Sequence, residues 1–360
     1  FNEGDTVNFN VNAPGHPVWL KDTAGTGANS GNYGTLDSSV TNNGTDNGTI
    51  VWNISSGLAG GGSGPNGYFY YQCQNHGSMV STIQVNSNAA GQVAFTTPGS
   101  YNWECPVGVT SVSVVCVGAG GTGGAYGGSG GSLAYKNNIT VTPGTTYSIA
   151  VGNTNSQIYA SPYSFDAENS SAFDCVAFGG IGGYSSGTAE GTFKAIGTGY
   201  DGGGRGGLAS GDKNVDGVYK EGAGGGAGGY SGDGGNAGKG NCDGSSGNRA
   251  PTAGSGGGGG GGTPTNVAGS NGTAGGGGGV GLLGEGASGA AGTYGALGTQ
   301  FGGGGSGGAD GTDPYGGQYG GGSGGQPGSP TPDMNAQHGA VRIIWPGDER
   351  QFPSTRTADE

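Results

Sequence analysis

Charged side chains are scarce in this sequence. Asp, Glu, Lys and Arg make up 10% of the 360 residues, and the 11 Lys and Arg leave a formal net charge of −13. Because phosphate contacts need clustered Lys and Arg, the few scattered cations argue against nucleic acid and anionic bilayers as partners. The low charge density also argues against an acidic disordered tail.

Long apolar runs are scarce as well. No stretch approaches the roughly 18 to 20 apolar residues that span a bilayer, and no signal peptide precedes the first β-like run. We therefore predict no membrane insertion. Because the chain begins at Phe1 inside a β-like run, we interpret it as a fragment of a longer protein. The lack of a targeting signal is then uninformative.

Histidine occurs only three times. His338 has no catalytic partner in its surroundings, and the sequence contains no recognisable Ser/His/Asp or paired-carboxylate arrangement. The pattern G-x-G-x-x-G recurs, but without the strand-to-helix context that gives it a dinucleotide meaning. We predict that the protein is not an enzyme.

Cysteine is present in an odd number with irregular spacing, which is not typical of a small disulfide scaffold. Cys105 and Cys116 flank two short β-like runs and could pair. The alternative is that these cysteines are buried free thiols, which behave as small apolar side chains. The five residues are Cys73, Cys105, Cys116, Cys175 and Cys242.

Glycine is far above the average share of about 7%, at 96 residues, most of them between Phe178 and His338. Runs such as 256–262 break any collagen-type repeat. One alternative is a flexible linker. The other is a bundle of extended helices with three residues per turn, as in polyglycine II. Such helices have no internal hydrogen bonds, so their N–H and C=O groups must bond to neighbouring segments.

The remaining sequence has a β pattern, with no convincing helical period. Apolar and polar residues alternate in Thr6–Val11, and an aromatic run at Tyr68–Tyr71 follows Gly- and Asn-rich turns, as is typical of antiparallel strands. Further runs follow within 92–151. A last run, Ala340–Trp345, cannot be stable alone, so we expect it to pair with the sheet of 92–151.

One constellation resembles a metal site. Cys73, His76 and Met79 follow an aromatic-rich run at C-x2-H-x2-M spacing, and His16 stands upstream at another strand end. Two imidazoles, a thiolate and a weak axial thioether are the ligands of blue-copper centres. Three of the ligands are close in sequence, whereas His16 must be brought to them by the fold.

Residues 1–87 therefore resemble the cupredoxin family, with a short ligand loop of the amicyanin type. The resemblance implies a Greek-key sandwich in which His16, Cys73 and His76 are equatorial copper ligands and Met79 is the axial one. The first strands of that fold are either absent or lie upstream of Phe1. The alternative is a rigid spacer whose ligand set is empty or vestigial.

Residues 91–360 resemble the glycine-rich domains of bacteriophage tail fibres and related virion proteins. The resemblance is carried by the segments Thr97–Val114, Leu133–Gly144 and Gly339–Gly347 more than by the glycine runs. In related adhesins, packed polyglycine helices display variable loops to a receptor on the host surface. The resemblance implies a virion or extracellular location and other virion proteins as partners.

Receptor contact is expected from aromatic residues that interrupt the glycine runs, because tyrosine offers a large contact area with few rotamers to immobilise. The alternative is that several of them are caps or small cores that hold the glycine bundle together. The candidates are Tyr184, Tyr200, Tyr219, Tyr230, Tyr294, Phe301, Tyr315 and Tyr319.

The sequence thus predicts an all-β protein of two modules: a cupredoxin-like Greek-key sandwich, and a small β-sandwich with a long insertion of the polyglycine II type. The first function expected is a structural and receptor-binding component of a bacteriophage virion. The alternative is a secreted or surface copper protein with a glycine-rich anchor. A homotrimer is left open, since no coiled coil is encoded. The boundaries are 1–87 (cupredoxin-like), 88–91 (linker), 92–151 with 339–347 (sandwich), 152–338 (insertion) and 348–360 (tail).

Overall fold

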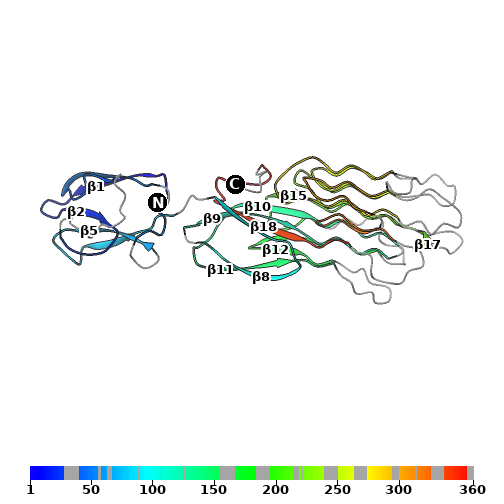
Figure 1. Ribbon diagram of the computed structural model, residues 1–360, viewed down its shortest axis with the longest axis horizontal. Helices are drawn as coiled ribbons and strands as arrows, with labels where there is room; N and C mark the ends of the chain where they lie inside the picture. The colour runs from blue at the N-terminus through cyan, green and yellow to red at the C-terminus, as the bar shows by residue number, and fades with distance from the viewer. Residues whose placement is uncertain are drawn as a thin grey trace. The chain divides into compact units, whose positions relative to one another are not determined.

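A computed structural model gives the structure of the protein (Figure 1). The secondary structure of its described residues is β throughout, and none of them forms a helix long and apolar enough to cross a membrane. The prediction of an all-β fold is therefore confirmed. The described residues are 1–27, 40–55, 58–62, 67–86, 90–106, 108–124, 126–154, 167–183, 195–213, 219–220, 222–238, 250–262, 274–293, 300–312, 314–325 and 336–354.

The chain divides into two compact units. The first unit contains residues 1–90, with 104–111 and 140–146. The second unit contains residues 91–103, 112–139 and 147–360. Each unit has its own buried apolar cluster.

In the first unit, short antiparallel strands form two three-stranded sheets, ordered β1-β4-β3 and β2-β5-β6. The alternation predicted from the sequence is visible in the first strand, whose residues are by turns exposed and half-buried. The strands are Thr6–Asn12 (β1), Val18–Lys21 (β2), Val40–Thr41 (β3), Asn47–Asn53 (β4), Phe69–Cys73 (β5) and Val80–Ile83 (β6).

The core of the first unit is small and aromatic. Trp52 of β4 and Phe69 of β5 are fully buried, with ring centroids 5.4 Å apart in an edge-to-face arrangement. Leu20 and Ile50 are buried in the same cluster. This packing brings together residues of the two sheets and thereby fixes the ends of β2 and β5, where the candidate metal ligands lie.

In the second unit, two five-stranded sheets are ordered β15-β10-β9-β18-β7 and β14-β13-β12-β11-β8, and β16 pairs with β17. The strands are Gly91–Phe95 (β7), Gly99–Glu104 (β8), Ser111–Val117 (β9), Leu133–Thr140 (β10), Thr146–Val151 (β11), Ser170–Ala172 (β12), Cys175–Ala177 (β13), Gly197–Thr198 (β14), Gly202–Gly204 (β15), Asp212–Lys213 (β16), Tyr219–Lys220 (β17) and Ala340–Trp345 (β18).

The C-terminal strand β18 lies between β9 and β7 in its sheet, antiparallel to both. Val341 is paired with Cys116 on one side and with Phe95 on the other. The prediction that this run returns to the sheet of 92–151 is confirmed. Its first five residues are buried, as expected for a strand with neighbours on both edges and both faces covered.

The described glycine-rich segments form a hydrogen-bonded bundle with a period of three residues. Gly224 and Ala227 donate their N–H groups to one neighbouring segment, 275–278. Gly225 and Gly228 donate theirs to a different neighbour. Successive N–H groups therefore point in different directions and return to the same direction every third residue, as in a helix with three residues per turn.

The carbonyl groups of the same segment follow the same rule and accept bonds from three further neighbours. The direction of the N–H and C=O groups repeats at every third residue, so these groups point to several sides of the segment. Each extended segment can therefore satisfy its backbone only when other segments surround it. The described glycine segments are therefore packed in a bundle and do not form a flexible linker. The six neighbours of segment 222–229 are 128–131, 207–210, 232–235, 258–261, 275–278 and 322–325.

Bundle segments continue directly from strands of the sandwich (Figure 1). Residues 118–132 connect β9 to β10, and residues 178–183 follow β13. The backbone of Gly118 donates to Ser132, and that of Ser132 donates to Phe178. The sheets of the second unit therefore extend into the bundle without a break in hydrogen bonding at these residues.

Candidate metal centre

The fold of the first unit brings His16 to the ligand loop. In the pairing of β2 with β5, Val18 lies opposite Cys73, so the residues just before β2 lie beside the end of β5. The hairpin from β5 to β6 then returns with Val80 opposite Gln72. Residues 74–79 form the connection, which carries His76 close to both.

Three donor atoms meet at this edge. The Nδ1 atoms of His16 and His76 are 3.1 Å apart, and the Sγ of Cys73 is 3.8 Å from the first and 3.5 Å from the second. The point equidistant from these atoms is about 2.0 Å from each, against usual metal distances of about 2.0–2.1 Å to nitrogen and about 2.3 Å to sulfur. The three side chains thus form a cluster that could hold one metal ion.

The donors differ in access to solvent. Cys73 is 2% exposed, His16 is half-buried and His76 is exposed. The backbone N–H of Asn75 donates to the Cys73 sulfur at 3.4 Å, and a bond of this kind stabilises negative charge on a thiolate. The site is therefore open to solvent on the side of His76 and closed at the sulfur.

Hydrogen bonds hold the two ligand-bearing segments together. The Asn75 amide donates to the carbonyl of Gly15 at 3.2 Å, and the N–H of Gln74 donates to the carbonyl of Pro17 at 2.8 Å. The indole of Trp19 donates to the Gln74 side chain at 3.1 Å. Bonds behind the ligands position them, since a metal needs its donors at fixed distances.

Met79 is fixed by its backbone. Its carbonyl accepts the N–H of Cys73 at 2.9 Å, and its own N–H donates to the carbonyl of His76 at 3.2 Å. The Met79 side chain is 46% exposed. Its role as an axial ligand stays a prediction, whereas His16, Cys73 and His76 are brought together.

The aromatic receptor candidates have different surroundings. Tyr200 and Tyr315 are 39% and 42% exposed, and Phe301 and Tyr319 are partly buried. Of the remaining four, Tyr184 and Tyr294 lie outside the described residues, only the backbone of Tyr219 is described, and Tyr230 is buried.

Tyr230 requires a correction, because it is a core residue rather than a surface one. It is 2% exposed, and its hydroxyl donates to the carbonyl of Gly281 at 3.1 Å. Its ring stacks on Phe352 at 5.9 Å. Burial raises the pKa of the Tyr230 hydroxyl well above its usual value. Tyr230 therefore agrees with the alternative prediction, that some of these aromatic side chains form small cores that hold the bundle together.

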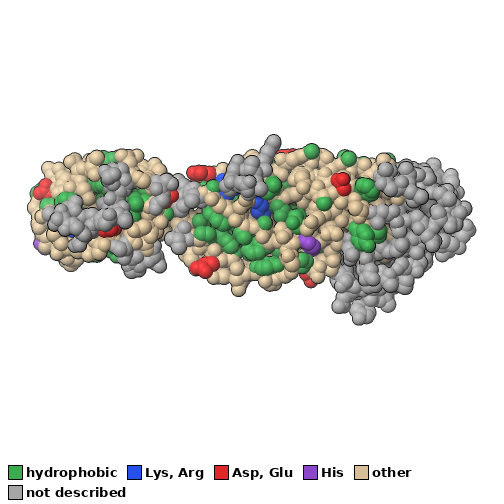
Figure 2. Space-filling model, in the orientation of Figure 1, with side chains coloured by type: hydrophobic (Ala, Val, Ile, Leu, Met, Phe, Trp, Pro, Cys, Tyr) green, Lys and Arg blue, Asp and Glu red, His purple; other side chains and the backbone are tan. Residues whose placement is uncertain are grey.

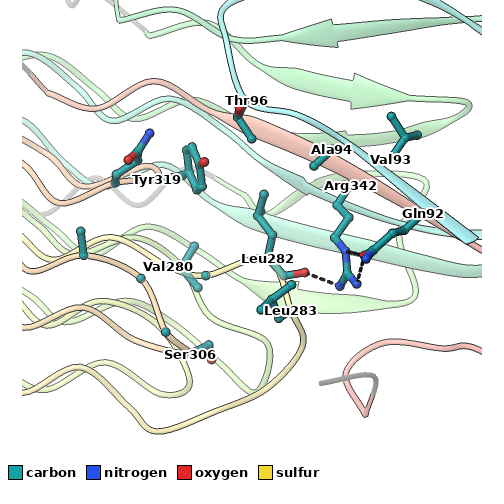
Figure 3. A pocket seen from close by; sticks show the side chains of 15 residues that line it. Gln92, Val93, Ala94, Thr96, Val280, Leu282, Leu283, Ser306, Tyr319 and Arg342 are labelled. Carbon is teal, nitrogen blue, oxygen red and sulfur yellow. Dashed lines mark hydrogen bonds between the residues drawn. The ribbon is translucent and has the colours of Figure 1, made fainter. Parts of the chain in front are cut away.

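Sequence reasoning did not find a groove in the second unit, of about 650 Å³ (Figure 3). Arg342 of β18 reaches it, donating to the side chain of Gln92 and to the carbonyl of Leu282 at 2.9 Å. Leu283, 40% exposed, also lines the groove. No local pattern indicates this groove, because its walls come from β7, β18 and bundle turns far apart in sequence.

The described cysteines are free and buried. Cys105 donates its thiol to the carbonyl of Val109 at 3.3 Å, so the pairing of Cys105 with Cys116 is not found. Burial raises the pKa of the Cys105 thiol from 9.0 to about 11. In the structure, the described cysteines therefore follow the alternative of buried free thiols.

Comparison with protein-family models found no match, and comparison with curated proteins found none either.

Proposed function

We propose that this protein is a structural and receptor-binding component of a bacteriophage particle, a tail fibre or adhesin that contacts the host surface. The observation that supports the proposal is the bundle in which every third N–H group bonds to the same neighbour. A segment whose backbone is bonded on all sides has little freedom to bend. Such a bundle is a rigid mount for residues that contact a receptor.

Surface chemistry agrees with a binding role that does not depend on strong charge. Few charged side chains are visible on the face drawn in Figure 2, and they are scattered. Tyr200 and Tyr315 are exposed in the second unit, and tyrosine is enriched at interface hot spots. We therefore assign receptor contact first to these two residues.

Location on a particle is the first test. Gold-labelled antibodies against the full chain should mark fibres of purified bacteriophage particles whose genome encodes the chain. Labelling of cell surfaces alone, with unlabelled particles, would contradict the proposal and favour the copper protein described below.

Binding is the second test. The fluorescent full chain should bind bacterial hosts of that bacteriophage, and the double substitution Tyr200→Ala with Tyr315→Ala should weaken binding about tenfold or more. The control is Tyr71→Ala, which removes an exposed tyrosine from the first unit. Equal binding by all three proteins would remove these tyrosines from the receptor site.

We propose a second function for the first unit, the binding of one copper ion by His16, Cys73 and His76. The observation that favours it is the triangle of two Nδ1 atoms and one Sγ, whose equidistant point is about 2.0 Å from each donor. Two imidazoles and one thiolate in a trigonal set are typical of blue copper. Copper would supply one-electron chemistry, and the protein side chains would hold it.

Addition of Cu(II) to the full chain tests this function. We expect an intense visible thiolate-to-copper band at one equivalent, its loss in Cys73→Ser, and its retention in the control Cys105→Ser. If the wild-type protein and Cys73→Ser have the same spectrum, copper is not bound through the thiolate and the function is rejected.

A further inference from the structure

Two cysteines that play no part in the metal cluster face one another inside the sandwich. Cys116 lies on β9 and Cys175 on β13, which belong to different sheets of the second unit. They are 59 residues apart in sequence. Both side chains are fully buried. Each sheet therefore contributes one thiol to the same interior region.

The two residues are in contact. The Cys116 thiol lies 3.7 Å from the carbonyl oxygen of Cys175. Burial, and then a hydrogen bond with the Cys175 side chain, hold the pKa of the Cys116 thiol well above its usual value. The two residues are thus neighbours, and the raised pKa of Cys116 keeps its thiol protonated in the folded protein.

The segments that leave the two sheets beside the cysteines come into close contact. Facing sheets are normally about 10 Å apart, whereas a disulfide needs Cα atoms about 4.4–6.8 Å apart. A Cβ placed on Gly118, two residues after Cys116, would lie 2.2 Å from the carbonyl oxygen of Phe178. A Cβ on Gly339 would lie 2.2 Å from the hydroxyl of Ser170. Glycine therefore lets the two backbones come into contact beside the cysteine pair.

We propose that Cys116 and Cys175 form a disulfide that joins the two sheets when the protein folds in an oxidising compartment. The S–H bonds of both residues are broken and one S–S bond is formed. The two protons and two electrons are taken up by a disulfide oxidant such as oxidised glutathione, which becomes two thiols. The reaction goes beyond attachment and copper binding and depends on neither.

Competing pairings are disfavoured among the described cysteines. Cys105 is bonded to Val109 within the first unit, and Cys73 belongs to the metal cluster. Cys242 lies outside the described residues. Because thiol exchange requires a thiolate and access for the oxidant, the bond forms before the sheets close and only slowly afterwards.

The experiment compares the full chain made in the bacterial periplasm with the same chain made in the cytosol. Peptide mapping without reductant should show a Cys116–Cys175 link in the periplasmic protein alone. Reduction after unfolding should remove it. Closing a loop of this length should raise the Tm of the second unit by about 10 °C.

Two variants made in the periplasm provide the controls. Cys175→Ala should lack the link and have the Tm of the cytosolic wild type, whereas Cys105→Ala should keep both the link and the higher Tm. Complete alkylation of Cys116 and Cys175 in the unfolded periplasmic protein would overturn the proposal. So would a link from either residue to Cys105 or Cys242. These results do not depend on whether receptor or copper binding is found.

Discussion

At the scale of single residues, the absence of a side chain is the main structural requirement of the bundle. Gly225 donates to Gly128 and accepts from Gly322, and a Cβ at this position would lie 2.0 Å from the carbonyl oxygen of Gly207. Ala223 and Ala227 flank it and are fully buried. A methyl group is therefore accommodated at some positions of the segment and excluded at others.

We predict that Gly225→Ala lowers the free energy of unfolding by roughly 2–4 kcal/mol, because the methyl group displaces a bonded neighbour. Urea unfolding of the full chain measures the effect. The control is Gly232→Ala, whose Cβ would meet only the side chain of Ser255, at 3.1 Å; we expect a change within about 1 kcal/mol. Equal losses would show that the bundle does not constrain Gly225.

The second residue-scale prediction concerns Cys105. Burial raises the pKa of its thiol from 9.0 to about 11, so at pH 9 the folded protein has about 1% thiolate and the unfolded protein about half. Alkylation of Cys105 by iodoacetamide, followed by peptide mass spectrometry, should be about fifty times slower in the folded state from ionisation alone. Similar rates would contradict the raised pKa.

The sign of this shift also sets a pH dependence. A raised thiol pKa means that the folded state keeps the proton that the unfolded state loses. The contribution of Cys105 to stability is therefore fully present below pH 9 and declines as pH rises towards 11. Part of the alkaline loss of stability should be absent in Cys105→Ala.

At the scale of elements, one buried cation connects β18, β7 and a bundle turn. Arg342 is 2% exposed, donates to Gln92 and to the carbonyl of Leu282, and lies 6.0 Å from the Phe352 ring centroid. Gln92 and Leu282 are neutral acceptors, and Phe352 offers an aromatic face. The Arg342 side chain thus connects β18 to residues that are distant in sequence.

We predict that Arg342→Met lowers the free energy of unfolding by about 2–4 kcal/mol, because it leaves buried acceptors without their donor. The matched control is Lys136→Met on β10. It breaks the exposed ion pair with Asp174, at 2.5 Å, and exposed pairs contribute about 0–1 kcal/mol. Denaturant titration of both variants distinguishes them, and similar losses would show that the Arg342 bonds add little.

At the scale of the whole molecule, the two compact units have separate cores. Trp52 and Phe69 belong to one cluster, and Val115 and Ile344 belong to the other. The metal ligands His16, Cys73 and His76 all lie in the first unit. A ligand that binds only the folded form of one unit stabilises that unit by mass action.

We therefore expect two transitions in calorimetry of the full chain. Copper at about one hundred times its Kd should stabilise the first unit by about 2.7 kcal/mol and leave the transition of the second unit unchanged. Cys73→Ser should abolish the shift. A metal-induced shift of both transitions, or of only the second, would place the ion elsewhere.

The sequence by itself determined the all-β class, the return of Ala340–Trp345 to the sheet and the ligand types of the metal cluster. The β class and the ligand types are local properties, because alternation, turn residues and the spacing of Cys73 and His76 are set by nearby residues. The return of Ala340–Trp345 followed from a different rule, that a lone strand is not stable and must pair with a sheet. The packed state of the glycine segments was one of two alternatives in the sequence. Hydrogen bonding between distant segments decided it.

Only the tertiary structure placed Tyr230 in the core, brought Cys116 to Cys175 and formed the groove beside Arg342. The physical reason is that these contacts join residues from about fifty to more than two hundred positions apart, and no periodicity extends across such separations. The low content of charged residues, 10% of the chain, agrees with this result. The protein is held together mainly by backbone hydrogen bonds and close packing, which depend on which segments become neighbours.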